Sequence, residues 1–112
     1  MNKELVEMWE LLVPTVKPNT NGTKFFKTKY HKVWDAYVRQ ITNGLTVLTP
    51  VKGQWVNASN VLFEERMIPV RILATKTQIE QIIDYSLKYY DQEAILAYKV
   101  SSDVILKYRS DK

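Results

Sequence analysis

Residues 61–90, VLFEERMIPVRILATKTQIEQIIDYSLKYY, place a long strand, a turn and a helix in direct succession. Apolar and polar side chains alternate most clearly in the second half of the strand, which we predict to span residues 61–74. The side that faces a core is formed by Ile68, Val70 and Ile72. Pro69 lies on the other side and favours an edge or bulged position, because proline cannot donate a ladder hydrogen bond.

The helix after this strand begins at a capping box, Thr75-Lys76-Thr77-Gln78. In this motif the threonine hydroxyl accepts a backbone N–H and the glutamine side chain bonds back to the capping residue. The apolar side chains that follow recur on one helical face and are Ile79, Ile82, Ile83, Leu87 and Tyr90. Residues 94–100 are then predicted to form another strand.

A second helix is predicted upstream by the clearest periodicity in the chain. Its apolar side chains share one face and are Tyr30, Val33, Trp34, Tyr37, Val38 and Ile41. Asn43-Gly44 ends this helix as a C-cap. Before it, residues 4–13 form a strand that Pro14 closes.

The segment between this helix and residues 61–74 is predicted to be a strand that Pro50 interrupts. Residues 45–49 form its first part and residues 53–56 continue it, past a bulge. Residues 57–60, Asn-Ala-Ser-Asn, are a turn, so residues 53–74 form a hairpin.

This order of elements, βαββαβ, predicts an α+β, ferredoxin-like sandwich in a single domain spanning residues 1–112. Its antiparallel sheet carries two helices on one face, and residues 104–108 add a short C-terminal strand. The other face is left bare and is lined by Trp55, Phe63, Met67 and Arg71. Because exposed apolar sheet faces are usually covered, we expect a homo-oligomer, a dimer or trimer formed through the sheets.

Composition excludes several classes of protein. The chain has no cysteine, which removes thiol nucleophiles, disulfides and thiolate metal sites, and its one histidine cannot build a histidine metal centre. No apolar run is long enough for a membrane span, and the N-terminal residues do not form a signal peptide. We therefore expect a cytoplasmic protein that uses no metal, and no membrane as a partner.

The formal net charge of +4 is concentrated in residues 17–39. Lys24, Lys27, Lys29 and Lys32 are therefore candidates for binding phosphate. RNA-recognition modules share the predicted strand order, but their third strand carries alternating aromatic residues, whereas residues 62–69 here include two glutamates. Nucleic acid is thus a disfavoured partner, and the lysines remain a second alternative.

Signals for catalysis are sparse. His31 and Glu65 are the two candidates for a general base, and no serine or cysteine nucleophile is placed beside either. The three glycines lie far apart, so no phosphate-binding loop is present and no cofactor is expected. A cofactor-independent enzyme of monooxygenase or isomerase type is the alternative to a role without catalysis.

Four stretches occur in an order typical of one group of proteins: Gly44-Leu-Thr-Val-Leu48, Gly53-Gln-Trp55, Glu65-Arg66 and Gln92-Glu-Ala-Ile-Leu96. This pattern resembles a small bacterial family of uncharacterised proteins, over roughly half of the chain. The resemblance brings no activity. It implies that a polar cluster forms from Gln54, Trp55, Glu65, Arg66, Gln92 and Glu93.

The sequence favours an oligomeric domain that binds a small ligand or a partner protein without catalysis. The contacts we predict for that ligand are Trp55, Glu65, Arg66 and Arg71.

Overall fold

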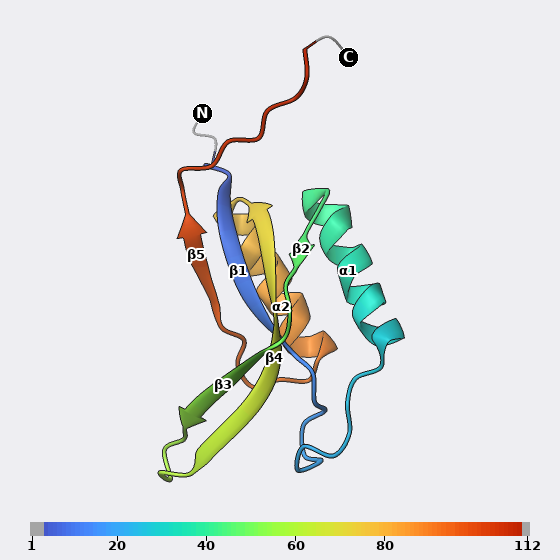
Figure 1. Cartoon of the computed structure of the whole chain (residues 1–112), viewed down its shortest axis with the longest axis vertical. Helices are drawn as coiled ribbons and strands as arrows, with labels where there is room; N and C mark the ends of the chain where they lie inside the picture. Colours follow the sequence, from blue (N-terminus) through green and yellow to red (C-terminus); the bar gives the residue numbers. More distant parts are fainter. Residues whose placement is uncertain (1–3, 111–112) are drawn as a thin grey trace.

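The computed structural model describes residues 4–110 and contains one sheet and two helices. In chain order the elements are β1 (Glu7–Pro14), α1 (Thr28–Thr42), β2 (Thr46–Val47), β3 (Val51–Val56), β4 (Leu62–Ala74), α2 (Lys76–Tyr89) and β5 (Ala97–Ser101). All strand pairs are antiparallel, in the order β5-β1-β4, with β2 and β3 both pairing along the far side of β4. Both helices lie on one face (Figure 1). This confirms the predicted ferredoxin-like βαββαβ fold.

The core lies between the sheet and the helices. Alternate residues of the two central strands point into it, and Leu11 of β1 is paired directly with Val70 of β4. The fully buried apolar residues are Leu11, Val13, Trp34, Val38, Val70, Ile72, Ala74, Ile79, Ile82 and Tyr90. The predicted core side of 61–74 is confirmed at Val70 and Ile72, while Ile68 is only partly buried at the margin.

Pro69 lies in an interior strand, so the predicted edge position is wrong, but the predicted interruption is found in the neighbouring strand. The Leu48 N–H donates to the Pro69 carbonyl at 2.9 Å. Since the N–H and C=O of a strand residue point to the same side, the missing donor of Pro69 faces the gap between β2 and β3. The break at Pro50 therefore lies where β4 has no hydrogen to offer.

Both helices end as the sequence predicts. Thr75 and Gln78 make the two reciprocal bonds of the capping box. Asn43 follows α1 in the left-handed conformation, with φ of 70°. Neither helix among the described residues is long and apolar enough to cross a membrane.

Two segments stand away from this body. The β3–β4 hairpin extends beyond the helices at one end of the molecule, and residues 102–110 run away from the other end (Figure 1). The radius of gyration is accordingly 15.8 Å, whereas a compact domain of this length has about 13 Å. The predicted strand over residues 104–108 is wrong within this chain, because the segment leaves the sheet and finds no neighbouring strand.

The two helices are joined by a polar contact inside the apolar core. The indole Nε1 of Trp34 donates to the Ser86 hydroxyl at 2.8 Å, and that hydroxyl donates to the Ile82 carbonyl at 2.6 Å. Ser86 is fully buried. Without the serine the indole N–H would lose its partner in a place that water does not reach.

We therefore expect Ser86→Ala to lower the free energy of unfolding by about 1–3 kcal/mol, the cost of an unsatisfied buried donor. Urea denaturation measures this loss. The same substitution in a Trp34→Phe background should cost clearly less, because phenylalanine has no N–H to satisfy. Equal losses in the two backgrounds would show that this hydrogen bond does not couple the helices.

Candidate functional site

The sheet face opposite the helices carries a buried carboxylate at its centre. Glu10 of β1 is only 7% exposed and lies between Arg71 of β4 and Tyr98 of β5. The Arg71 Nε donates to the Glu10 carboxylate at 2.9 Å, and the Tyr98 hydroxyl donates to its other oxygen. We call these three residues the Glu10 clamp. The clamp ties three adjacent strands together on the open face.

The clamp also determines the charge of Glu10. The hydrogen bond from Tyr98 lowers the pKa of the Glu10 carboxyl, burial opposes this change, and Arg71 lowers the pKa further. The same hydrogen bond raises the pKa of the Tyr98 hydroxyl. Glu10 is therefore ionised at neutral pH. Arg71 uses only its Nε in the clamp, so its outer nitrogens make no hydrogen bond to another described residue.

A second group of side chains lies on the same face of the β3–β4 hairpin. Trp55 stacks on Phe63 with ring centroids 4.7 Å apart and planes 16° apart. Trp55 remains 47% exposed. Alternation along β4 places Glu65 on this face, next to Phe63, and its ladder partner is Gly53. We call Trp55, Phe63 and Glu65 the hairpin site.

Glu65 differs from the other carboxylates of the sheet. It is partly buried, yet its side chain makes no hydrogen bond or ion pair with any other residue that the structure describes. By contrast, Glu64 on the opposite face pairs with Lys52 at 3.3 Å and accepts from Gln54. An unpaired carboxylate beside an exposed aromatic stack is suited to a ligand that has both a flat ring and a positive charge.

Gly53 keeps the surface beside Glu65 open. A Cβ at this position would lie 2.3 Å from the Cε of Met67. The absence of a side chain thus lets Met67 lie across β3, where it borders the hairpin site. Any larger residue would have to displace the Met67 side chain.

The structure separates the four predicted ligand contacts. Trp55 and Glu65 share the hairpin site, whereas Arg66 points to the opposite face, as strand alternation requires. Arg71 is on the correct face but six residues along β4 from Glu65, which is about 20 Å at about 3.3 Å per residue. One small molecule on a single subunit cannot contact both.

The six-residue polar cluster implied by the family resemblance does not form. Gln54 bonds to Glu64 on the opposite face from Glu65. Gln92 lies after α2, where its side chain donates to the Tyr90 carbonyl at 3.0 Å. Each of these two glutamines meets a local partner instead.

The two predicted general bases also lie apart. His31 is on α1, in the helical layer, and its Nδ1 lies 2.7 Å from the Tyr90 hydroxyl. Burial lowers the pKa of His31, an effect that Asp35 partly offsets. Burial raises the pKa of Tyr90. His31 is therefore a neutral partner of a buried tyrosine, with the sheet between it and Glu65.

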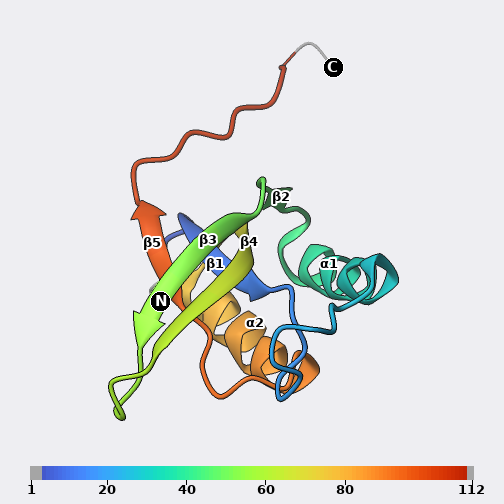
Figure 2. The ribbon, with the colours of Figure 1, turned by 60° about the horizontal axis from the view of Figure 1, so that its bottom comes forward.

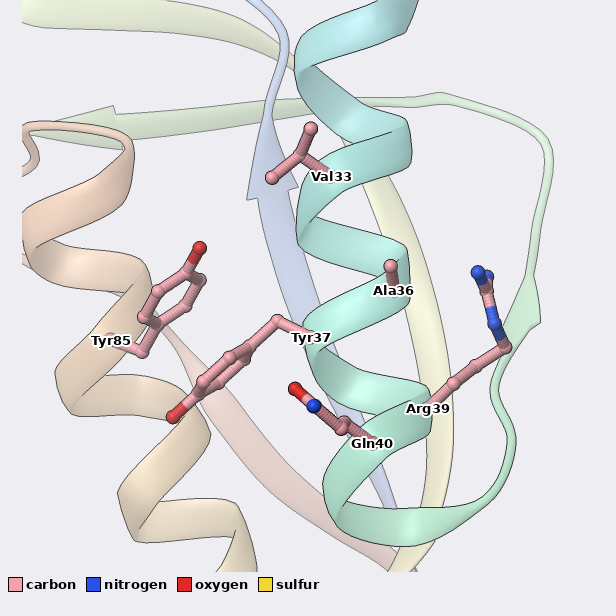
Figure 3. Close-up of a pocket in the computed structure, with 6 residues that line it drawn as sticks. All are labelled: Val33, Ala36, Tyr37, Arg39, Gln40 and Tyr85. Atoms are coloured by element: carbon pink, nitrogen blue, oxygen red, sulfur yellow. The ribbon is translucent and has the colours of Figure 1, made fainter.

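Two hollows follow the outer seam between the helices. One, of about 350 Å³, is lined by Lys17, Lys27, Lys29, Tyr30, Val33 and Tyr89. The other, of about 580 Å³, shares Val33 and lies beside the stacked rings of Tyr37 and Tyr85, 3.6 Å apart (Figure 3). The structure thus places Lys27 and Lys29 together, adds Lys17, and leaves Lys24 and Lys32 outside the first hollow.

Sequence reasoning missed several members of these sites. Lys17 is brought to Lys27 by the loop before α1, through the backbone bond from Lys17 to Lys24 at 2.8 Å. Tyr98 reaches Glu10 across 88 positions of sequence. The spacing of Tyr85 and Tyr89, four residues apart, could have indicated a shared helical face. Nothing local pointed to the Glu10 clamp.

Within residues 4–110, no group of three or more His, Cys, Asp or Glu side chains is arranged to hold a metal ion.

Comparison with known proteins identifies relatives in fold only. No protein-family model and no curated protein sequence matches this chain. A phage SAM lyase in complex with S-methyl-5'-thioadenosine superposes with a TM-score of 0.63 and 9% identity, over 96% of this chain and 92% of that one. The divalent ion tolerance protein CutA1 from Ehrlichia chaffeensis has a TM-score of 0.59 and 4% identity, over 98% and 90% of the chains. The divalent cation tolerance protein Cut A1 from Thermus thermophilus has 0.59 and 7%, over 96% and 90%.

The Glu10 clamp predicts an acid-sensitive component of stability. Because the folded-state pKa of Glu10 lies below the ordinary value of 4.5, the unfolded chain binds the proton more readily. The unfolding free energy should therefore fall as pH drops below 4.5. Glu10→Gln should be less stable at neutral pH and should show a shallower loss in this range. Denaturation at several pH values measures both, with Glu93→Gln, an exposed position, as the control. An unchanged acid profile in Glu10→Gln would contradict the prediction.

The prediction of a phosphate site at the lysine-lined hollow has a direct test. Inorganic pyrophosphate binding, measured by calorimetry, should weaken steeply between about 50 and 200 mM salt, because the attraction is between exposed charges. Lys27→Ala with Lys29→Ala should weaken it further, while Lys24→Ala with Lys32→Ala, outside the hollow, should change it less. Binding that ignores salt, or no binding at low salt, would remove this site.

Proposed function

We propose that this protein is a homo-oligomeric domain that binds a small ligand at the hairpin site. The observation that carries the proposal is the unpaired, partly buried carboxylate of Glu65 beside the exposed Trp55–Phe63 stack. Leaving an aromatic pair exposed and a carboxylate without a partner stabilises nothing within one subunit. A ligand or a second subunit gives both a role.

The chemistry of the hairpin site favours a ligand with a planar ring and a cationic centre. Stacking of a nucleobase on an aromatic side chain contributes about 1–3 kcal/mol. A cation near Glu65 would gain a charge partner that the chain itself does not provide. S-adenosylmethionine combines an adenine with a sulfonium cation and is therefore the first ligand to test. The phage lyase of the same fold, which holds S-methyl-5'-thioadenosine, supports this choice.

The proposed homo-oligomer rests on the exposed apolar residues of the hairpin. They lie on both faces, with Trp55 and Phe63 on one side and Val56 and Leu62 on the other. Isolated apolar residues on a surface are ordinary, but a contiguous group on a protruding element is typical of an interface. A second subunit would also enclose a ligand that otherwise lies on an open surface.

Lyase activity at the same site is the second candidate, favoured by the position of Glu65. Release of S-methyl-5'-thioadenosine from S-adenosylmethionine breaks one C–S bond and leaves the bonding electron pair on sulfur. Glu65 is the group placed to stabilise the sulfonium cation before this step. The monooxygenase and isomerase alternatives have no comparable support from the geometry.

Binding to S-adenosylmethionine and to neutral S-methyl-5'-thioadenosine, followed by tryptophan fluorescence, separates the two contributions. Trp55→Phe should serve as the fluorescence reference, and Trp55→Ala, measured by calorimetry, should weaken both ligands about tenfold or more. Glu65→Gln should weaken the cationic ligand about tenfold while changing the neutral one little. Glu64→Gln, the same substitution on the opposite face, should affect neither.

Chromatography of the same incubations tests the second candidate, because released S-methyl-5'-thioadenosine is detected directly. Binding without release supports the first function and removes the lyase. Failure of both ligands to bind would reject this ligand class. A monomer at tens of micromolar, seen by native mass spectrometry, would reject the homo-oligomer.

A further inference from the structure

The segment after β5 is an extended arm with strongly exposed apolar side chains. Residues 102–110 leave the sheet and run away from the body in both views (Figures 1 and 2). Ile105 is 89% exposed, Leu106 64% and Tyr108 80%. Among the described residues, none from 104 to 108 makes a hydrogen bond. The backbone of this stretch therefore has donors and acceptors available for pairing.

The sequence of the arm is typical of a strand covered on both faces. Val104, Ile105 and Leu106 are consecutive, so an extended chain places apolar side chains on each side. Strands of this kind are normally buried on both faces. The sequence predicts a strand here for the same reason, but this chain offers it no neighbour.

The β3 strand presents the complementary surface. It pairs only with β4, so its outer edge is unpaired within the described residues. The hairpin that contains it is apolar on both faces, with Trp55 and Phe63 on one and Val56 and Leu62 on the other. An unprotected edge of this kind pairs readily with another strand. β3 has six residues, which suits a partner of the length of residues 104–108.

The two surfaces cannot meet within one molecule. The arm leaves one end of the long axis and the hairpin lies at the other (Figure 1). The molecule is 54 Å long, and nine residues span at most about 30 Å when fully extended. The arm also points away from the hairpin. Pairing must therefore be between subunits.

We infer that the arm, residues 102–110, adds as a strand to the outer edge of β3 in a second copy of this chain. This inference rests on the proposed homo-oligomer and names its contact surface. The contact is head to tail, since each subunit gives an arm at one end and receives one at the other. Contacts of this type generate closed rings when the rotation between subunits closes.

The arm also completes the hairpin site. A strand beside β3 lies next to Gly53 and Trp55, where the single subunit is open. Its side chains on that face form a wall along the Trp55–Phe63 stack. The ligand would then be held between β4 of one subunit and the arm of another.

Two variants with complementary defects test this inference. Ile105→Asp with Leu106→Asp disables the arm and leaves β3 intact. Val56→Asp with Leu62→Asp disables the apolar surface next to β3 on the face away from the hairpin site, and leaves the arm intact. All four positions are exposed in the single subunit. Native mass spectrometry and light scattering report the mass of each variant alone and of their equimolar mixture.

We expect the unaltered chain to be a ring of two or three subunits and each variant to be a monomer of about 13.1 kDa. The mixture should give a 1:1 complex, because one intact arm meets one intact β3 edge. Formation of that complex also shows that both variants are folded. Lys107→Ala, in the arm but without loss of apolar area at Ile105 and Leu106, is the control and should assemble normally.

Three results would overturn the inference, and they differ from one another. A ring that persists in Ile105→Asp with Leu106→Asp would show that subunits associate without the arm, which leaves the proposed homo-oligomer standing. Monomeric variants whose mixture forms no complex would show that the arm and β3 are not partners. An unaltered chain that is monomeric would reject the homo-oligomer itself and the arm with it.

Discussion

The antiparallel pairing of β1 with β4 governs the geometry of the whole sheet. Eight residues of β1 are paired in register with Met67–Ala74 at the end of β4. Because side chains of a strand alternate between two faces, this register decides every contact of the central sheet. Leu11 and Val70 point together toward the helices, and Glu10 and Arg71 point together toward the open face. A slip by one residue would bury the carboxylate among leucine and isoleucine.

The Glu10 clamp and the hairpin site are opposite solutions to the same exposed sheet face. At the centre, Glu10 is ionised and satisfied on both oxygens, so it links three strands and leaves little for a ligand. At the hairpin, the Glu65 side chain has no partner among the described residues and the aromatic rings remain open. The satisfied group stabilises the fold, and the unsatisfied one is available for binding. The helical face supports both, since its apolar core holds the sheet against α1 and α2.

Aromatic residues are also divided between the two layers. Those of the helices are packed and hydrogen bonded, as Tyr90 is with His31 and Trp34 is with Ser86. Those of the hairpin and the arm are exposed and have no such partners. In one subunit the molecule therefore has a complete core and two incomplete surfaces. The incomplete surfaces lie at opposite ends, which a head-to-tail assembly would bring together.

Local patterns in the sequence specify the elements and their order, whereas the grouping of residues into sites depends on packing. The capping box at Thr75, the periodicity of residues 30–41 and the alternation of residues 66–72 each depend on neighbours within a few positions. These signals predict the ferredoxin-like fold and the composition of its bare face. The resemblance to an uncharacterised bacterial family stays a prediction, as does the cytoplasmic location. Alternation places Arg66 on the wrong face for the hairpin site, and the length of β4 separates Arg71 from Glu65, although all three are close in sequence. The partners of Glu10 come from strands 61 and 88 positions away, which no local pattern encodes. The arm shows the same limit: its sequence predicts a strand, but a strand exists only beside a neighbour. Local signals specify what a segment is able to form, and the three-dimensional packing specifies what it meets.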